Sequence, residues 1–377
     1  MRTSIDEIST QEESHPSDRE KVAFFTSLLL GWFEEEGRDL PWRRTRDPYK
    51  IWISEVILQQ TRVVQGLEYY RRFIERYPDV RTLAQSGEEE LLLMWQGLGY
   101  YSRAHNLHEA AKSIVSEYGG IFPRDPKEVR QLKGIGDYTC AAICSIAYDE
   151  PMAVLDGNVY RVMSRFNAEE TPIDSTEGKK LFSQLADLYL DRNHPGLYNQ
   201  AIMDLGAMVC IPTGARCLIC PVNEQCPASF TELTERLPVK SRKVAVKEIY
   251  LDYILVECEE SFSAERRDKG SIWKGLYQLP LLHSGSTPLT EEALEEKMEH
   301  QLGGKPTWAT WESVQMTHLL THRRLHIAIH AVRMDCDEPP SMKGYIQIPK
   351  DLHHQYAFPK PLREYLNKRY PEGNPAE

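Results

Sequence analysis

The feature that most constrains this chain is a run of four cysteines within seventeen residues, CIPTGARCLICPVNEQC at 210–226. Their spacing is C-x6-C-x2-C-x5-C, with thiols at Cys210, Cys217, Cys220 and Cys226. Zinc sites commonly pair their ligands as two close couples, whereas here one couple lies between two single cysteines. Four thiolates in so short a loop are typical of an iron-sulfur cube. The spacing therefore favours an iron-sulfur cluster over zinc, with a disulfide staple as the third alternative.

Whether the four cysteines can form disulfides depends on the cellular compartment in which the protein is found. The apolar run FFTSLLLGWF at 24–33 is too short to span a bilayer and is followed directly by three glutamates, so we expect a buried helix. It lacks the basic region and the small-residue cleavage site of a signal peptide. The sequence thus predicts a cytoplasmic protein without a membrane partner. Thiols stay reduced there, which disfavours a disulfide staple.

Hydrophobic periodicity divides the chain into parts. Residues 1–19 are polar and acidic, which predicts a disordered tail. Over 20–230 apolar residues recur every three or four positions, as in KKLFSQLADLYL, which predicts an all-helical domain. Residues 231–246 turn basic and lose this period, which indicates a linker. Over 247–370 the strand-like runs EIYLDYILVEC and LHIAIHAVRM and the amphipathic stretch EEALEEKMEHQLGG predict a smaller α+β domain.

The net charge of −11, taken alone, argues against a nucleic-acid partner. Nine acidic and three basic side chains in residues 1–36 account for −6 of it, and basic residues cluster between Arg38 and Arg124. A local basic patch is sufficient for DNA binding, so the net charge does not exclude DNA.

The stretch LKGIGDYTCAAICSIA at 132–147 places Gly134 and Gly136 in a tight turn before an alanine-rich helix, and PKEVRQL before it has a short helical pattern. Glycine lets the backbone approach a ligand closely, and the free N–H groups of a helix start bind anions. The order helix, turn, helix fits a phosphate-holding helix-hairpin-helix motif and does not fit the strand-first dinucleotide fold. An ordinary helix connection has the same pattern.

Two carboxylates stand in contrasting surroundings. Glu55 lies in the apolar helix KIWISEVILQQT, where burial would raise its pKa and make it a general acid, although helical rotation could equally turn it to solvent. Asp156 precedes a glycine turn in AVLDGNVYRV, where Asn158 can cap the following helix, and a plain turn role is the commoner one. Such a pair meets the requirement for cleaving a glycosidic bond through an oxocarbenium-like state.

A rival metal signal comes from four histidines that recur at every fourth position, His318, His322, His326 and His330. The run LHIAIHAV alternates apolar side chains, which predicts a strand with histidines on its other face. A histidine metal site is therefore the less favoured interpretation.

From PWR at 41–43 through Cys226 the chain resembles the A/G-specific adenine DNA glycosylases of the endonuclease III helix-hairpin-helix superfamily. The resemblance implies that Glu55 protonates adenine and that Asp156 stabilises the sugar cation or bonds to it transiently. Two polar residues are expected to support them, Tyr138 and Asn158. The cysteine spacing matches the family's ligand pattern for one 4Fe-4S cluster.

The same resemblance implies DNA contacts. Tyr100, in WQGLGYYSRAHNL, would wedge into the DNA stack, with Gln60 on the same surface. Gly134 and Gly136 would approach a DNA phosphate.

Towards the C-terminus, IWKGLYQLP at 272–280 is similar to the Nudix-like domain with which these enzymes detect 8-oxoguanine. Leu320, Thr321 and His322 stand at the family's Phe-Ser-His loop, so Thr321 and His322 are the expected lesion-reading residues. The segment aligned with the magnesium-binding motif of working Nudix enzymes, residues 296–303, lacks the needed carboxylates, so we expect no pyrophosphatase activity.

The implied function is removal of adenine mispaired with 8-oxoguanine or guanine in double-stranded DNA by a monomeric enzyme. Strand-cutting members of the superfamily carry lysine where Tyr138 stands, so we expect no strand cleavage. The alternatives are an endonuclease III type enzyme acting on oxidised pyrimidines, a lesion-binding protein without catalysis, and an iron-sulfur redox sensor.

Overall fold

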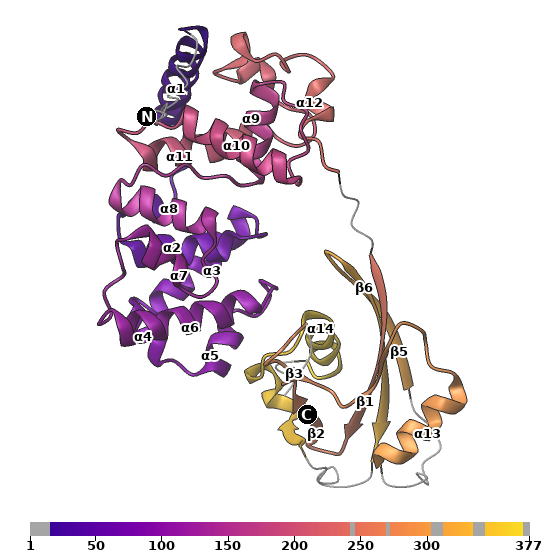
Figure 1. The fold of residues 1–377 in the computed structure, drawn as a ribbon. Coiled ribbons are helices and arrows are strands. Elements are labelled where there is room, and N and C mark those ends of the chain that lie inside the picture. Colours follow the sequence, from indigo (N-terminus) through magenta and orange to yellow (C-terminus); the bar gives the residue numbers. More distant parts are fainter. Residues whose placement is uncertain (1–15, 242–245, 269–271, 303–311, 335–343, 372–377) are drawn as a thin grey trace, which may run out of the picture. The chain divides into compact units, whose positions relative to one another are not determined.

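A computed structural model describes residues 16–241, 246–268, 272–302, 312–334 and 344–371. The chain packs into two compact units. One unit comprises Met1–Tyr70 and Ile121–Arg242, and the other comprises Arg71–Gly120 and Lys243–Glu377. Figure 1 shows that the first consists of helices and that the second contains the sheet.

The first unit is built from α-helices joined by short connections. Its main helices are α1 Pro16–Glu36, α2 Pro48–Leu58, the start of α3 Val63–Arg76, α7 Pro126–Gln131, α8 Asp137–Tyr148, α9 Gly157–Phe166, α10 Thr176–Tyr189 and α11 Pro195–Asp204. Shorter turns are η1 Pro41–Arg43, the π-helical η2 Leu205–Val209, η3 Cys217–Ile219, η4 Asn223–Gln225 and α12 Leu233–Arg236. None of the described helices is both long and apolar enough to cross a membrane.

Polar caps begin several of these helices. Asp47 accepts a hydrogen bond from the N–H of Tyr49, and Pro48 occupies the first turn of α2, where a missing N–H costs nothing. Ser175 caps α10 in the same way. These local signals fix where the site-bearing helices start.

One apolar cluster of the first unit joins α1 to α8, α9, α10 and α11. The run expected to form a buried helix, residues 24–33, is helical as part of α1, but it is buried on one face only: Phe25 and Leu29 are completely buried, whereas Leu28 is exposed. They pack with buried side chains of α9 such as Met163 and Phe166. Three cysteines of the 210–226 run and Tyr138 pack against the same core, so one apolar centre supports both candidate sites.

The second unit combines helices with a seven-stranded sheet of order β3-β2-β1-β6-β5, in which β4 also pairs with β1 and β7 with β2. Its helices are the end of α3, α4 Val80–Gln85, α5 Glu88–Met94, α6 Ser102–Glu117, α13 Glu291–Leu302, the 3-10 turn η5 Lys350–Gln355 and α14 Lys360–Arg369. Its strands are β1 Lys247–Glu257, β2 Ser261–Arg266, β3 Tyr277–Gln278, β4 Leu281–Gly285, β5 Glu312–Leu320, β6 Arg323–Arg333 and β7 Ile346–Pro349. The strands expected from EIYLDYILVEC and LHIAIHAVRM are β1 and β6, and the expected helix is α13.

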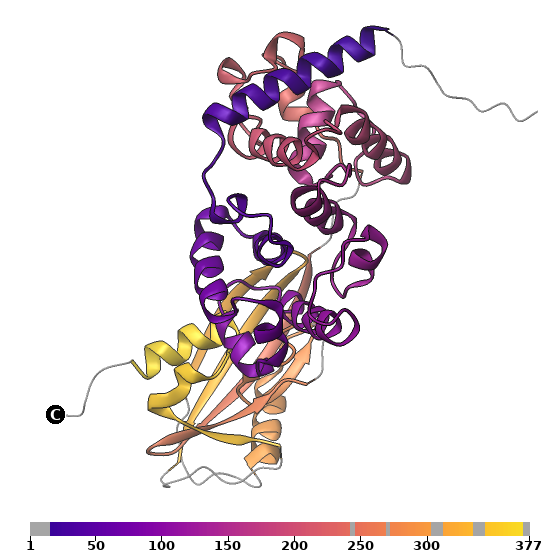
Figure 2. The same cartoon turned by 90° about the vertical axis from the view of Figure 1, so that its left-hand side faces the viewer.

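The sheet is covered on both faces. Strands β1 and β6 run parallel in continuous register, and β5 pairs antiparallel with β6. Ile254 and Val256 of β1 pack with Met298 of α13, whereas Glu257, on the other face of the strand, binds Arg369 of α14 at 3.0 Å. Figure 2 shows α13 and α14 on either side of the strands.

The boundaries drawn from the sequence stay a prediction, but the structure adds detail at each. Helix α1 takes up the last four residues of the expected tail, and residues 1–15 lie outside the described residues. Within the expected linker, α12 is helical and the carbonyl of Val239 accepts from the N–H of Ile173 at 3.0 Å, while 242–245 lie outside the described residues. Residues 71–120 group with the C-terminal part of the chain, which periodicity did not anticipate.

Candidate active site

Helix α2 turns Glu55 inward, so the solvent-facing alternative is wrong. The side chain is 7% exposed, and the hydroxyl of Tyr138 donates a hydrogen bond to its Oε2 at 2.7 Å. Burial raises the pKa of Glu55 to about 7, the Tyr138 hydrogen bond and the charge of Arg43 oppose the rise, and the charge of Asp156 adds to it. A carboxyl group with this pKa is substantially protonated near neutral pH and can donate a proton.

Asp156 is the N-cap of α9, in extended conformation. Its Oδ1 accepts from the backbone N–H groups of Asn158 at 2.9 Å and Val159 at 2.8 Å. The side-chain amide of Asn158 donates to Oδ2 at 2.9 Å, so the expected supporting residue does contact this carboxylate. Burial raises the pKa of Asp156, and these hydrogen bonds oppose the rise. Donors converge on both oxygens, which stabilises the charged form.

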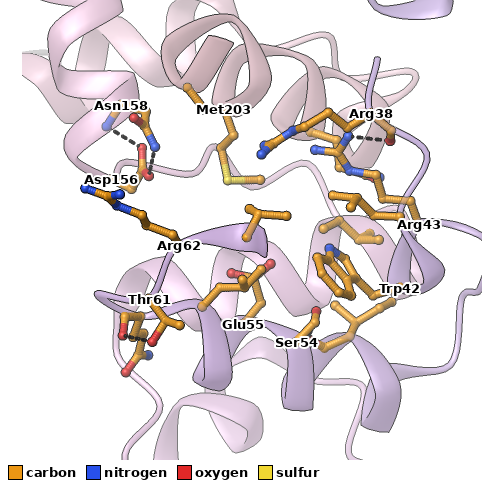
Figure 3. Close-up of a pocket in the computed structure, with 18 of the residues that line it drawn as sticks. Arg38, Trp42, Arg43, Ser54, Glu55, Thr61, Arg62, Asp156, Asn158 and Met203 are labelled. Carbon is orange, nitrogen blue, oxygen red and sulfur yellow. Dashed lines mark hydrogen bonds between the residues drawn. The ribbon is translucent and has the colours of Figure 1, made fainter. Parts of the chain in front are cut away.

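Both carboxylates open into one cavity of about 750 Å³ that lies wholly within the first unit. Figure 3 shows Glu55 and Asp156 on different walls, with Met203 of α11 reaching between them. The Tyr138 hydroxyl, which bonds to Glu55, also lies 3.3 Å from the sulfur of Met203. The structure therefore brings together the four residues that the sequence singled out for chemistry, Glu55, Tyr138, Asp156 and Asn158.

The sequence reasoning missed an ionic cluster in the cavity wall. Asp204, at the end of α11, is completely buried and accepts hydrogen bonds from Arg38 and Arg43, both of which line the cavity. Burial opposes the ionised form, but the hydrogen bonds from Arg43 and Arg38 win and lower the pKa of Asp204. The signal that could have revealed the cluster is an aspartate inside the apolar run QAIMDLGAMV.

The four cysteines of the 210–226 run line one small cavity of about 30 Å³, and all four are free. Arg165 of α9 lies over it, with Nη1 3.4 Å from Cys210 Sγ and 2.8 Å from the carbonyl oxygen of Ile211. Burial raises the pKa of the Cys220 thiol to about 12.

In the described part of the chain, no three His, Cys, Asp or Glu side chains converge as a single metal ion requires. A cluster distributes its four thiolates over different iron atoms, whereas zinc requires all of its sulfur ligands at about 2.3 Å from one point. The four thiols around one cavity are a donor set that an iron-sulfur cluster can use.

Helices α7 and α8 and the turn between them form the expected hairpin. Gly134 adopts φ +80°, which a side chain would strain, and Gly136 stands in extended conformation as the N-cap of α8. Both glycines are exposed, while Ile135 between them is buried and anchors the turn. The start of this twelve-residue helix is thus accessible to an anion.

The residues expected to contact DNA belong to different units. Gln60 is exposed, has φ +58° and lines the active-site cavity of the first unit. In the second unit, Tyr100 has φ +47°, and its hydroxyl contacts that of Thr321. Tyr100, Thr321 and His322 line a further cavity of about 740 Å³. Positive φ is uncommon for side chains other than glycine and is found at functional turns.

The histidines at every fourth position do not gather around a metal site. The predicted alternation is confirmed, because Leu325, Ile327 and Ile329 of β6 are buried. His326 instead binds Glu248 at 2.7 Å, and His330 lies 3.3 Å from Asp252.

Comparison with known proteins agrees with this fold. Residues 53–186 match the HhH-GPD superfamily of base excision DNA repair proteins, and residues 253–368 match the NUDIX domain. The adenine DNA glycosylase of Buchnera aphidicola subsp. Acyrthosiphon pisum is 32% identical over 346 residues, which cover 91% of this chain and 96% of that protein. The adenine DNA glycosylase of Mus musculus is 43% identical over 221 residues, which cover 56% of this chain and 43% of that protein.

Among solved structures, a thermostable thymine-DNA glycosylase superimposes with a TM-score of 0.52 at 29% identity and covers 56% of this chain and 98% of its own. A helix-hairpin-helix unit with two carboxylates in one cavity, followed by a Nudix-like domain, defines a base-excision DNA glycosylase. More specifically, the chain belongs to the adenine DNA glycosylase family. The family resemblance inferred from the sequence is confirmed, as is the fold class.

Proposed function

We propose that this chain hydrolyses the N-glycosidic bond of adenine paired with 8-oxoguanine or guanine in double-stranded DNA and leaves an abasic site. The observation that carries the proposal is the pair of carboxylates in one cavity, with the pKa of Glu55 raised to about 7 by burial. The names of the relatives support adenine as the base.

Glu55 acts as the general acid. Adenine leaves poorly as an anion, so protonation of a ring nitrogen lowers the barrier to its departure. The Tyr138 hydroxyl donates to Oε2 of Glu55, which leaves Oε1 to carry the proton toward the base. The reacting bond is shielded within a duplex, so the adenine must be flipped into the cavity first.

Asp156 stabilises the positive charge that develops on the sugar. Its carboxylate is held by Asn158 and by the start of α9, so it does not reorient during the reaction. It can also direct water to the sugar carbon once adenine has left.

Contacts with DNA come from both units. The exposed hairpin at Gly134 and Gly136 holds a phosphate of the DNA backbone through N–H groups. Gln60, at the mouth of the active-site cavity, and Tyr100 take up the gap left by the flipped base. Thr321 and His322 read 8-oxoguanine.

The protein binds one 4Fe-4S cluster through Cys210, Cys217, Cys220 and Cys226. When bound, it supplies iron-thiolate bonds that tie the 210–226 loop together. The arginines of α9 hold the carbonyl oxygens of this loop through hydrogen bonds.

The proposal is tested by measuring adenine release from a duplex that contains A:8-oxoguanine under single-turnover conditions. We expect release by the unaltered protein and none by Glu55→Gln or Asp156→Asn, both of which keep shape and should still bind the duplex. An unaltered protein that releases only oxidised pyrimidines, or that binds the lesion without releasing a base, would refute the proposal.

A further inference from the structure

A buried carboxylate outside the reacting pair anchors the wall of the active-site cavity. Asp204 is 0% exposed and accepts from Nη1 and Nη2 of Arg43, each at 2.6 Å. It also accepts from the backbone N–H of Arg38 at 3.1 Å and from Nε of the same residue at 2.9 Å. Both oxygens of this one carboxylate thus serve two guanidinium groups, and both arginines line the cavity that holds Glu55.

The position of Arg43 depends on these contacts. Its side chain is 12% exposed and lies over the ring of Phe33, and Nη1 also donates to the carbonyl oxygen of Arg38. None of these other partners carries a charge. Two neighbouring guanidinium groups repel each other, and a buried cation without a counter-charge is costly. Asp204 therefore permits the two arginines to share one wall.

Arg43 in turn acts on the catalytic acid, because its positive charge favours the ionised form of Glu55 and lowers its pKa. Figure 3 shows Arg38 and Arg43 together at one end of the cavity and Asp156 at the other, with Glu55 between them. Glu55 thus lies between the positive charge of Arg43, which lowers its pKa, and the negative charge of Asp156, which raises it.

We propose that Asp204 is a positioning residue of the reaction, which holds and partly neutralises Arg43 in the cavity wall and so sets the electrostatic field at Glu55. The inference rests on the proposed function, in which Glu55 is the proton donor. Asp204 does not touch the reacting atoms and acts through Arg43.

Charged and titratable groups reach Glu55 from several elements. Tyr138 faces it from α8, Asp156 from the N-cap of α9, and Arg43 from η1, while Arg38 and Arg62 also line the cavity. Replacing Asp204 with asparagine removes the negative charge that compensates Arg43. The uncompensated Arg43 then favours ionised Glu55 more strongly, so the acid loses its proton at a lower pH.

The test is the pH dependence of single-turnover adenine release from an A:8-oxoguanine duplex. The rate should fall as Glu55 ionises, and in Asp204→Asn this falling limb should lie about one pH unit lower than in the unaltered protein. Arg43→Met should move the limb to higher pH, because it removes a positive charge that favours ionised Glu55. Asp204→Glu keeps the charge and should restore the limb.

The matched control is Asp39→Asn, which makes the same chemical change in an exposed pair with Arg44. It should leave the limb unmoved. A folded Asp204→Asn protein whose limb is unmoved, or lies at higher pH than in the unaltered protein, overturns the inference. If Asp204→Asn does not fold, Arg43→Met and Asp204→Glu carry the test, and an unmoved limb in Arg43→Met refutes it. Because the unaltered protein must first release adenine, failure of the proposed function is recognised separately.

Discussion

The surroundings of one carboxyl group, that of Glu55, suit the proposed reaction but lower the stability of the folded protein. The group is buried, and the hydroxyl of Tyr138 donates a hydrogen bond to it. The surroundings that suit proton donation therefore penalise the ionised form. The resulting loss of folding stability depends on pH, because it arises only when Glu55 is ionised.

Glu55→Gln should be more stable than the unaltered protein at pH 8. Because the pKa of Glu55 is about 7 in the folded protein and about 4.5 when unfolded, its contribution to stability is present below pH 4.5 and is lost as pH rises through 7. A shift of this size corresponds to about 3 kcal/mol. Thermal unfolding at pH 5 and pH 8 measures the effect, with the exposed Glu35→Gln as the control. A Tm difference between variant and unaltered protein that is the same at both pH values would contradict it.

The expected absence of strand cleavage rests on Tyr138. A phenol cannot form an imine with the sugar, so borohydride should trap little adduct of the unaltered protein on DNA. In Tyr138→Lys an amine would stand in the cavity that holds Asp156 and should produce both a trapped adduct and some strand cleavage. Denaturing gels of the trapped complex measure this. Efficient trapping of the unaltered protein would mean that it is a lyase.

At the scale of elements, α9 links the two candidate sites. It starts at the cap Asp156, and Arg161 of its second turn donates to the carbonyl oxygen of Cys210 at 2.6 Å. Arg165 continues this contact from the last turn. One helix therefore contacts both the carboxylate proposed to act on the sugar and the cysteine loop.

The cysteine loop should depend on its metal. The purified protein should be brown with about four irons per chain, and Cys220→Ser should lose most of the colour and iron and unfold at a lower temperature. Cys140→Ser is the matched control, since this buried thiol lies outside the loop and donates to the carbonyl oxygen of Pro126, as a hydroxyl also can. Visible absorbance and iron analysis distinguish the two. Stoichiometric zinc in a colourless protein would contradict this prediction.

Local patterns predicted most elements and the ligand-bearing stretches, because a helix or strand is determined largely by neighbouring residues. The period of three to four predicted the buried helix at 24–33, and alternation predicted β1 and β6. Sequence alone left Glu55 undecided, since its orientation depends on packing against α8. The Arg38–Asp204 contact joins residues 166 positions apart, so no local pattern announces it. The grouping of residues 71–120 with the C-terminal part was not predicted either, because it depends on contacts between residues far apart in the sequence.

For the whole molecule, the division into two units implies separable functions. The active-site cavity is built only from the first unit, whereas Thr321 and His322 belong to the second. The net charge of −11 makes DNA binding depend on local basic groups rather than on the protein as a whole.

Replacing Thr321 and His322 together with alanine should reduce the preference for A:8-oxoguanine over A:G about tenfold, as expected for the loss of one or two hydrogen bonds. The rate of adenine release from A:G should change little, because the carboxylates are untouched. Single-turnover rates on the two duplexes measure the ratio, and Ser284→Ala, an exposed hydroxyl of the same unit, is the control. An unchanged ratio would show that the two residues do not read the lesion.

Asp156 serves both as the cap of α9 and as the proposed counter-charge to the sugar, which limits the residues that this position can accept. As a helix cap the position accepts asparagine, aspartate and serine about equally well, and threonine or glycine less well. In its proposed role as the counter-charge to a sugar cation the position accepts only a carboxylate, and glutamate is not among the good caps. Aspartate is the one amino acid that meets both demands. Any substitution at 156 should therefore weaken the start of α9, the proposed chemistry, or both.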